Sequence, residues 1–414
     1  MVISKISAHV FYKAMRRKST IIPIILLLFS ACSTQSNTII SKSSVTQVAS
    51  VTATAVPPSF LNPPGASSPP ISLKQAWGNV NITTISEQFP GGMVFSGVNI
   101  SPDGNDLIGI YGTAASRLIN SRWVAILHIP TMQITKLEYT SQFTYYFAID
   151  QNWAVWLEEP SYDEEAWVIH AYNRLTGQSA IVAKNIIVNG KPVNYVPYIS
   201  LYNDDLVWSQ TAQTPQGIQK QAWLRNLKTG VNTVMSTNGT GALISWPWAA
   251  WASLQSTQES SYMVMENLQT QQQYIIHQVP SYYAIYGASI AYSGPNLHHM
   301  YYIPDVTKSD TPEIVKTADA NTEVYVEFPE LNQRLISWQM ATNALIWDNT
   351  LQRLVQLPFV DTTDTTNSAE ICGHYLIWTD AITAQVLHTA MQQRTWADSN
   401  IYIIDINTLP TSIP

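Results

Sequence analysis

Tyrosine pairs are the residues of this chain best suited to bind another molecule. Each pair stands just before a short apolar run that predicts a strand. The pairs are Tyr145 with Tyr146, Tyr195 with Tyr198, and Tyr282 with Tyr283. A tyrosine ring offers a broad apolar face and a polar hydroxyl, so it can stack on a sugar or a peptide. The alternative role for these rings is packing at the rim of the fold.

Acidic residues gather in one short segment, and two adjacent histidines stand in another. The acidic residues are Glu158, Glu159, Asp163, Glu164 and Glu165. Carboxylates are ligands that calcium takes, but this segment lacks the alternating acidic spacing and the turn glycine of a calcium loop. His298 and His299 are poorly placed to hold one ion, because adjacent side chains in a strand point to opposite faces. We therefore expect a solvated acidic loop, surface histidines and no metal site.

Motifs of a catalytic centre are missing from the sequence. The chain has no G-x-S-x-G segment, so the hydrolase domain that often accompanies repeat folds built from short strands is not encoded. It also has no H-E-x-x-H, Walker or C-x-x-C segment. The sequence indicates no catalytic residue and no cofactor. Cys372 stands at the head of an apolar run, where a buried and unreactive thiol is expected.

The strands that must position the tyrosines belong to a repeat. A short apolar run that ends in an aromatic residue occurs seven times, with spacings of 45, 52, 43, 41, 46 and 40 residues. The aromatic residues are Tyr111, Trp156, Trp208, Trp251, Tyr292, Trp338 and Trp378. A repeat of about 40–50 residues built from short strands is typical of a β-propeller. Because neighbouring blades cover each other's faces, we expect these residues to fill the core between blades.

Turn and strand motifs of the repeat point to a known family. A Ser-Pro-Asp-Gly turn at 101–104 precedes the second strand of the first repeat. Residues 202–205 stand at the equivalent position in the third repeat. The third strand at 166–172 alternates and leads to a Leu-Thr-Gly turn at 175–177. In these motifs residues 71–414 resemble the TolB-type propellers, relatives of the WD40 class. The resemblance implies an all-β, seven-bladed propeller of four-stranded antiparallel blades. It says little about function, because propellers host many activities.

The propeller interpretation gives the tyrosines a common position. The starts of the innermost strands surround one mouth of a propeller's central channel, and the six tyrosines stand at such starts. Residues 380–399 form the longest connection, with apolar residues at helical spacing over 381–391, and Trp396 follows them. We expect this connection to cover the same face. The candidate ligand-binding residues are therefore Tyr145, Tyr146, Tyr195, Tyr198, Tyr282, Tyr283 and Trp396.

The last repeat has no room for a fourth strand of its own. After Leu409 only residues 410–414 remain, and two of them are proline, which is a poor strand former. Residues 80–85 alternate as an outer strand would, yet no repeat of their own surrounds them. An unpaired strand edge invites aggregation. We therefore expect 80–85 to pair with 400–406 and to close the ring as the outermost strand of blade seven.

The N-terminal segment has the pattern of a signal peptide. Residues 1–31 hold five basic residues and no acid, with an apolar run at 21–29. Residues 28–32 resemble the bacterial lipoprotein box, which implies that Cys32 is the first mature residue and carries acyl chains. Residues 32–70 are rich in Ser, Thr and Pro and predict a tether, and 71–414 form the propeller. The alternatives are that the N-terminal segment stays uncleaved as a membrane anchor, or that the protein is secreted without lipidation.

Charge narrows the range of partners. Charged residues make up 12% of the chain, and without residues 1–31 the balance is 16 basic against 28 acidic residues, or −12. An acidic body argues against nucleic acid as a partner. We expect an extracytoplasmic, membrane-anchored monomer that binds a protein or a glycan at the channel mouth without catalysis. The alternative is a propeller-type polysaccharide lyase or glycoside hydrolase, which needs convergent carboxylates, or histidine with a metal, at that mouth.

Overall fold

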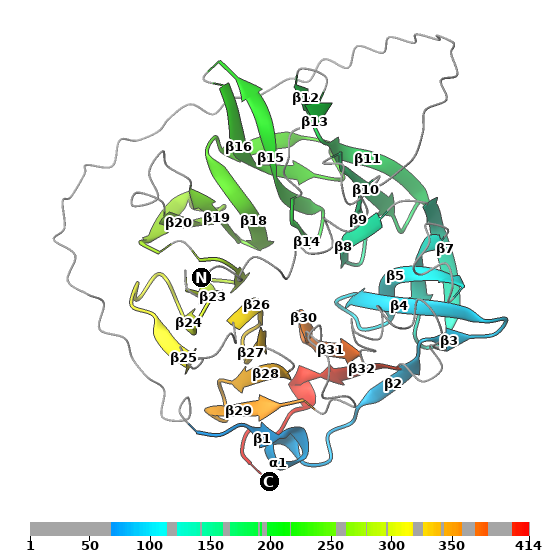
Figure 1. The fold of residues 1–414 in the computed structure, drawn as a ribbon, viewed down its shortest axis with the longest axis vertical. Helices are drawn as coiled ribbons and strands as arrows, with labels where there is room; N and C mark the ends of the chain where they lie inside the picture. Colours follow the sequence, from blue (N-terminus) through cyan, green and yellow to red (C-terminus); the bar gives the residue numbers. More distant parts are fainter. Residues whose placement is uncertain are drawn as a thin grey trace, which may run out of the picture.

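The fold is a seven-bladed β-propeller, seen in a computed structural model of the chain. The structure describes residues 68–113, 122–140, 143–159, 166–188, 191–192, 197–215, 217–253, 262–278, 280–294, 297–317, 326–340, 343–357, 369–379 and 400–413. These residues form seven blade sheets and one small two-stranded sheet. Figure 1 shows the chain passing once around the ring, from blade one in cyan to blade seven in orange and red.

Blades one to four each hold a four-stranded antiparallel meander, whose strands follow one another from the axis outward. Blade one has β4 (Met93–Ile100), β5 (Asp106–Thr113), β6 (Arg122–His128) and β7 (Gln133–Thr140). Blade two has β8 (Phe143–Ile149), β9 (Trp153–Glu159), β10 (Val168–Asn173) and β11 (Gln178–Lys184). Blade three has β14 (Ile199–Tyr202), β15 (Asp205–Thr214), β16 (Gly217–Asn226) and β17 (Asn232–Ser236). Blade four has β18 (Gly239–Ser245), β19 (Trp248–Ser253), β20 (Tyr262–Asn267) and β21 (Gln272–Ile276).

The remaining blades follow the same plan, except that the N-terminal segment adds strands to two of them. Blade five has β22 (Tyr283–Tyr286), β23 (Ser289–Ser293), β24 (His299–Ile303) and β25 (Glu313–Thr317). Blade six has β26 (Val326–Leu331), β27 (Leu335–Met340), β28 (Asn343–Asp348), β29 (Arg353–Gln356) and then β1 (Ile71–Ser72). Blade seven has β30 (Glu370–Cys372), β31 (Tyr375–Thr379), β32 (Asn400–Asp405) and β2 (Thr83–Ser86). Two short additions are β3 (Gln88–Phe89), beside β4, and the pair β12 (Ile187–Val188) and β13 (Lys191–Pro192).

The core lies between blades, as the repeat predicts. Each of the seven hydrophobic clusters of the described residues joins two neighbouring blades. Six of the seven repeat aromatics are at most 3% exposed, namely Trp156, Trp208, Trp251, Tyr292, Trp338 and Trp378. Several stack on the residue directly opposite in the third strand, such as Trp156 on His170 and Trp378 on Tyr402. Their assignment to the core rather than to ligand binding is confirmed.

The N-terminal strand closes the ring. β2 pairs antiparallel with β32, from Thr83 opposite Ile403 to Ser86 opposite Asn400. The predicted closure is therefore confirmed, although the strand begins three residues later than the predicted 80–85. Val80 and Ile82 instead pack against the cluster between blades six and seven. After β32 the chain turns into the short 3-10 helix η3 (Ile406–Thr408), so blade seven takes its fourth strand from the other end of the chain.

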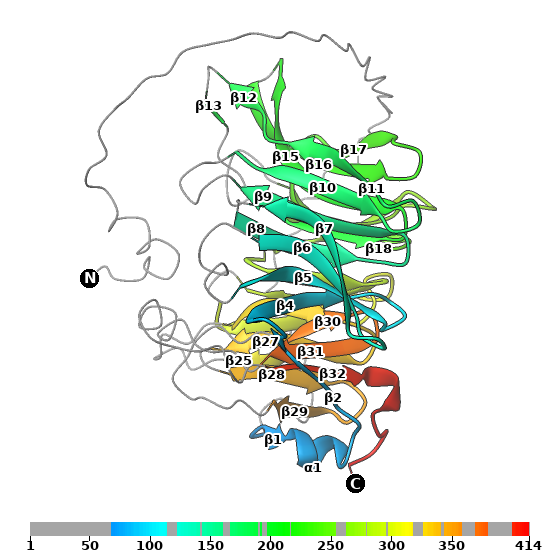
Figure 2. The same ribbon diagram turned by 90° about the vertical axis from the view of Figure 1, so that its right-hand side faces the viewer.

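A second attachment of the N-terminal segment was not predicted. β1 pairs in parallel with β29, and the helix α1 (Leu73–Trp77) follows, with Leu73, Ala76 and Trp77 buried. Ser72 caps this helix: its Oγ accepts from the Gln75 N–H at 3.3 Å, and the Gln75 side chain accepts from the Ser72 N–H at 2.9 Å. Figure 2 shows β1 and α1 beside β29. No helix within the described ranges is long and apolar enough to cross a membrane.

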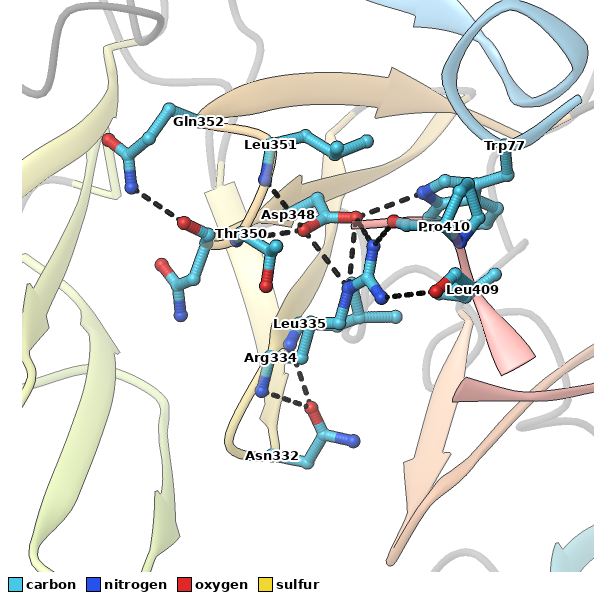
Figure 3. Close-up of polar contacts among 11 residues, drawn as sticks. Trp77, Asn332, Arg334, Leu335, Asp348, Thr350, Leu351, Gln352, Leu409 and Pro410 are labelled. Carbon is cyan, nitrogen blue, oxygen red and sulfur yellow. Dashed lines mark hydrogen bonds and ion pairs between the residues drawn. The ribbon is translucent and has the colours of Figure 1, made fainter. Parts of the chain in front are cut away.

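The N-terminal and C-terminal segments of the propeller both contact one buried ion pair. Asp348, which is fully buried, accepts from Arg334 Nη2 at 2.8 Å and from Trp77 Nε1 at 3.0 Å. Arg334 also donates to the carbonyl oxygens of Leu409, at 2.9 Å, and Pro410, at 2.5 Å. Figure 3 shows Trp77 and Arg334 meeting at Asp348, and the carbonyls of Leu409 and Pro410 meeting at Arg334. We call residues 71–86 and 400–410, with Arg334 and Asp348, the closure seam.

Candidate functional site at the mouth of the propeller

Four aromatic residues lie where the innermost strands of four blades begin. Tyr146 lies in β8, Tyr198 directly precedes β14, Tyr282 directly precedes β22, and Phe328 lies in β26. Tyr146 and Tyr198 are each 38% exposed and Phe328 is 42% exposed, so these rings face solvent far more than the repeat aromatics do. We call these four residues, together with Glu159 and Glu327, the mouth.

Two of the mouth aromatics stand in strained backbone within strands. The pairing register shifts between Tyr145 and Ala148 in β8 and between Glu327 and Glu330 in β26, and inside these bulges Tyr146 and Phe328 adopt φ of 47° and 49°. A bulge re-aims a side chain, and a non-glycine residue at positive φ costs about 1–3 kcal/mol. The other described non-glycine residues with positive φ lie in turns or bends: Met132, Asn203, Gln271, Leu297 and Gln352.

The mouth rings contact each other across blade boundaries. The centroids of Tyr146 and Tyr198, from blades two and three, are 4.7 Å apart with 56° between the ring planes. Those of Tyr282 and Phe328, from blades five and six, are 4.4 Å apart with 47° between the planes. Because the rings of each pair are tilted, their faces do not form one flat shelf. They can instead surround a compact group from more than one side.

Electrostatic interactions link the two ring pairs of the mouth. Burial raises the pKa of Tyr146, and Tyr198, Glu159 and Tyr282 raise it further. Burial also raises the pKa of Tyr282, and Glu327 and Tyr198 add to this effect. Groups from blades two, three, five and six therefore influence one another's ionisation.

Carboxyl groups accompany the mouth rings. Glu159 ends β9 and is 6% exposed, and burial raises its pKa to about 7. Burial also raises the pKa of Glu327. Further along β26, burial and then the nearby charge of Glu370 in β30 raise the pKa of Glu330 well above its usual range. The protein thus holds several carboxyls in surroundings that disfavour their charge, which is frequent at functional sites.

The structure brings together some of the predicted site residues and separates others. Tyr146, Tyr198 and Tyr282 lie at the mouth. Tyr283 instead packs against the core cluster between blades four and five, and its hydroxyl donates to the Gly241 carbonyl. The backbone of Tyr145 pairs with Leu157, but its side chain lies outside the described part of the structure. Tyr195, Trp396 and Cys32 also lie outside the described residues.

Sequence reasoning missed three members of the mouth. Phe328 occupies the same position in blade six as the tyrosines do in their blades, so a search for any aromatic residue at an innermost strand start would have found it. Glu159 was assigned to a solvated acidic loop, yet it is buried beside the mouth rings. Glu327 precedes Phe328 and had no distinguishing signal in the sequence.

The described residues of the other candidate groups, Glu158, His299 and Cys372, contact other parts of the fold. Within the described ranges, no group of three His, Cys, Asp or Glu side chains could hold a metal ion. Glu158 accepts from Trp156 Nε1 at 3.2 Å and lies 3.5 Å from His170 Nε2. The His299 ring lies 5.7 Å from that of Tyr301, and burial lowers the His299 pKa. Burial raises the pKa of the Cys372 thiol, with Glu370 adding to the effect, which agrees with an unreactive cysteine.

Comparison with known proteins adds nothing beyond the fold. No family model matches the chain, and no curated protein matches it. A prolyl endopeptidase structure is similar at 10% identity and a TM-score of 0.49, covering 74% of this chain and 47% of that one. TolB from Acinetobacter baumannii is similar at 10% identity and a TM-score of 0.39, covering 59% and 61%. The propeller domain of the Trilobed protease from Pyrococcus furiosus is similar at 8% identity and a TM-score of 0.43, covering 62% and 79%.

The class of this protein is therefore the seven-bladed β-propeller, defined by its own strand order. The chain spans about half the length of the prolyl endopeptidase structure it matches. The endopeptidase activity in that name is a property of that protein.

Proposed function

We propose that this chain is a lipid-anchored, extracytoplasmic β-propeller whose mouth binds a protein or glycan without transforming it. The observation that carries the proposal is the pair of aromatic residues, Tyr146 and Phe328, held at positive φ inside bulged strands with Tyr198 and Tyr282 beside them. A ring needed only for packing would gain more by burial, as the repeat aromatics do. Strain combined with exposure is what a ligand-binding surface requires.

Anchoring follows from the sequence of the N-terminal segment. The lipoprotein-like box places acyl chains on Cys32, and two or more chains suffice for stable attachment to a membrane. Residues 33–70 would then tether the propeller outside the cytoplasm. Mass spectrometry of the mature N-terminus tests this part of the proposal. A diacylated peptide that begins at Cys32 supports it, whereas an unmodified peptide with another start contradicts it, and Cys32→Ala is the matched variant.

Binding is tested with purified protein on a glycan array and in a pull-down from envelope extract. The parent protein is compared with a variant that carries Tyr198→Leu and Tyr282→Leu, and with a control that carries Tyr139→Leu on the exposed surface of β7. We expect any specific ligand to be retained by the control and to bind the mouth variant at least about fivefold more weakly, since each of the two aromatic contacts contributes about 0.5–1.5 kcal/mol. If the ligand binds the mouth variant and the control equally well, the mouth rings serve packing rather than binding.

A second candidate function is cleavage of a polysaccharide. Glu159 favours it, because burial raises the pKa of its carboxyl to about 7, the range of a general acid. Glu327 would supply the second carboxyl of a glycosidase pair. Incubation with polysaccharides, followed by assays for reducing ends and for unsaturated products, tests this candidate. Turnover that Glu159→Gln abolishes would replace the binding proposal with an enzymatic one.

A further inference from the structure

Carboxyl groups follow the aromatic rings from the mouth toward the interior. Glu159 pairs with Phe143 at the start of β8, and Glu327 directly precedes Phe328 in β26, so both belong to the mouth. Glu330, also in β26, and Glu370, in the neighbouring innermost strand β30, influence each other's charge. The body of the protein outside residues 1–31 carries a formal charge of −12. In their ionised forms, carboxyls on innermost strands of a strongly acidic body produce a negative potential at that end of the axis, which attracts cations and repels anions.

The aromatic rings suit the same kind of ligand. The faces of Tyr, Phe and Trp rings attract ammonium and guanidinium groups, and the attraction grows as water is excluded. Because the rings within the two pairs are tilted by 56° and 47°, their faces point in more than one direction. A flat sugar face would instead be matched by a coplanar shelf.

We infer that the mouth binds a basic side chain of a protein segment, with its cationic group against the aromatic rings and near Glu159 and Glu327. This inference rests on the ligand-binding function proposed above and names its partner class. Lysine and arginine fit because each has an apolar stem that can lie along the rings and a charged end that can reach the carboxyls. Charge complementarity favours them over an anionic polysaccharide, which the carboxyls would repel.

Four probes separate charge from shape and protein from glycan. They are an acetyl-Gly-Lys-Gly-amide peptide, its norleucine analogue without the charge, a glucosamine trisaccharide with free amines, and its neutral N-acetylated form. Calorimetric titration of the full-length protein in detergent is performed at low salt and at about 0.15 M salt, where the Debye length is about 8 Å. We expect the lysine peptide to bind in the millimolar range, about fivefold or more tighter than the norleucine peptide, and more weakly when salt is added.

Isosteric variants assign the effect to the mouth. Glu159→Gln and Glu327→Gln remove the carboxylate charges without a change of size, and each should weaken binding of the lysine peptide about threefold to fivefold. Glu266→Gln is the matched control, because Glu266 lies near the end of β20 remote from the mouth and contacts Gln273 at 2.8 Å. It should leave the affinity unchanged.

Each of the other possible titration results would contradict a different part of the inference. Equal affinity for the lysine and norleucine peptides, reduced alike by Tyr282→Leu, would overturn charge selection but leave the mouth as a binding site. Tighter binding of the glucosamine trisaccharide than of the lysine peptide would overturn the protein partner in favour of a cationic glycan. No binding of the lysine peptide at millimolar concentration and low salt would overturn the inference. The array and pull-down described above would still decide whether the mouth binds anything.

Discussion

The strand β26 runs from the mouth toward the closure seam. Polar groups have opposite surroundings in these two regions. Arg334 stands just beyond the far end of β26 and forms an ion pair with the fully buried Asp348, which also accepts from Trp77 and from the backbone N–H groups of Thr350 and Leu351. At the beginning of the same strand, Phe328 is 42% exposed at positive φ, and burial disfavours the charge of Glu327.

The contrast separates stability from function. At the seam a buried charge has an opposite charge and several donors, which is the condition under which burying it is tolerated. At the mouth, backbone strain and raised carboxyl pKa values oppose folding, so their presence needs another explanation. We expect changes at the seam to unfold the protein, and changes at the mouth to leave it folded while altering what it binds.

Loss of one partner of the seam ion pair should have the largest effect. Arg334→Met leaves Asp348 buried without a cation, so we expect the free energy of unfolding to fall by about 3–5 kcal/mol. Urea unfolding followed by tryptophan fluorescence measures it. The double variant with Arg334→Met and Asp348→Leu should recover most of the loss. As a control, Lys308→Met breaks an ion pair whose lysine side chain is 80% exposed and should leave stability nearly unchanged.

Removal of one hydrogen bond at the seam should have a smaller effect. Trp77→Phe keeps an aromatic ring at a position that is 2% exposed but removes the Nε1–H that donates to Asp348. We expect a loss of about 1–3 kcal/mol, because the acceptor is a buried carboxylate. The same unfolding assay applies, with Tyr202→Phe at a 40% exposed position as the neutral control. No change in Trp77→Phe would show that α1 is not attached to blade six through this contact.

The seam also shows how far the sequence predicts this fold. The spacing of the repeat aromatics predicts seven blades, and the count of strands in blade seven predicts that β2 closes the ring. The helix α1 and strand β1 were missed because five and two residues are too few to produce a periodicity. The Ser72 and Gln75 capping box was the available signal.

Only some residues of the mouth could be predicted, and the physical reason differs from the one that applies at the seam. Strand starts could be recognised, so Tyr146, Tyr198 and Tyr282 could be assigned to one end of the axis. Which face a residue presents depends on bulges, and a bulge shifts the alternation by one residue without a sequence signature. The bulge in β26 therefore hid the direction of the Phe328 ring, although its place at a strand start could have been recognised. Tyr283 was assigned to the mouth together with Tyr282, but adjacent residues of a strand point to opposite faces, and Tyr283 packs between blades.

A carboxyl at the mouth should make stability depend on pH. Burial raises the pKa of Glu159 to about 7, so its neutral form stabilises the folded state in full below its ordinary range near 4.5. That contribution is lost as pH rises through about 7. Glu159→Gln removes the titration, so the variant should gain about 1–2 kcal/mol over the parent between pH 5 and pH 8.5. Unfolding curves at both pH values measure the gain, and a constant difference between the two proteins would show that Glu159 does not titrate in this range.

The proposed function requires that the mouth aromatics are held in strained backbone for binding rather than for stability. Urea unfolding of a variant with Tyr146→Gly and Phe328→Gly tests it most directly, because glycine adopts positive φ without strain and has no ring to pack. We expect a free energy of unfolding within about 1 kcal/mol of the parent, since relief of strain offsets the lost ring contacts. A loss as large as that expected for Arg334→Met would contradict it and would make the mouth part of the core.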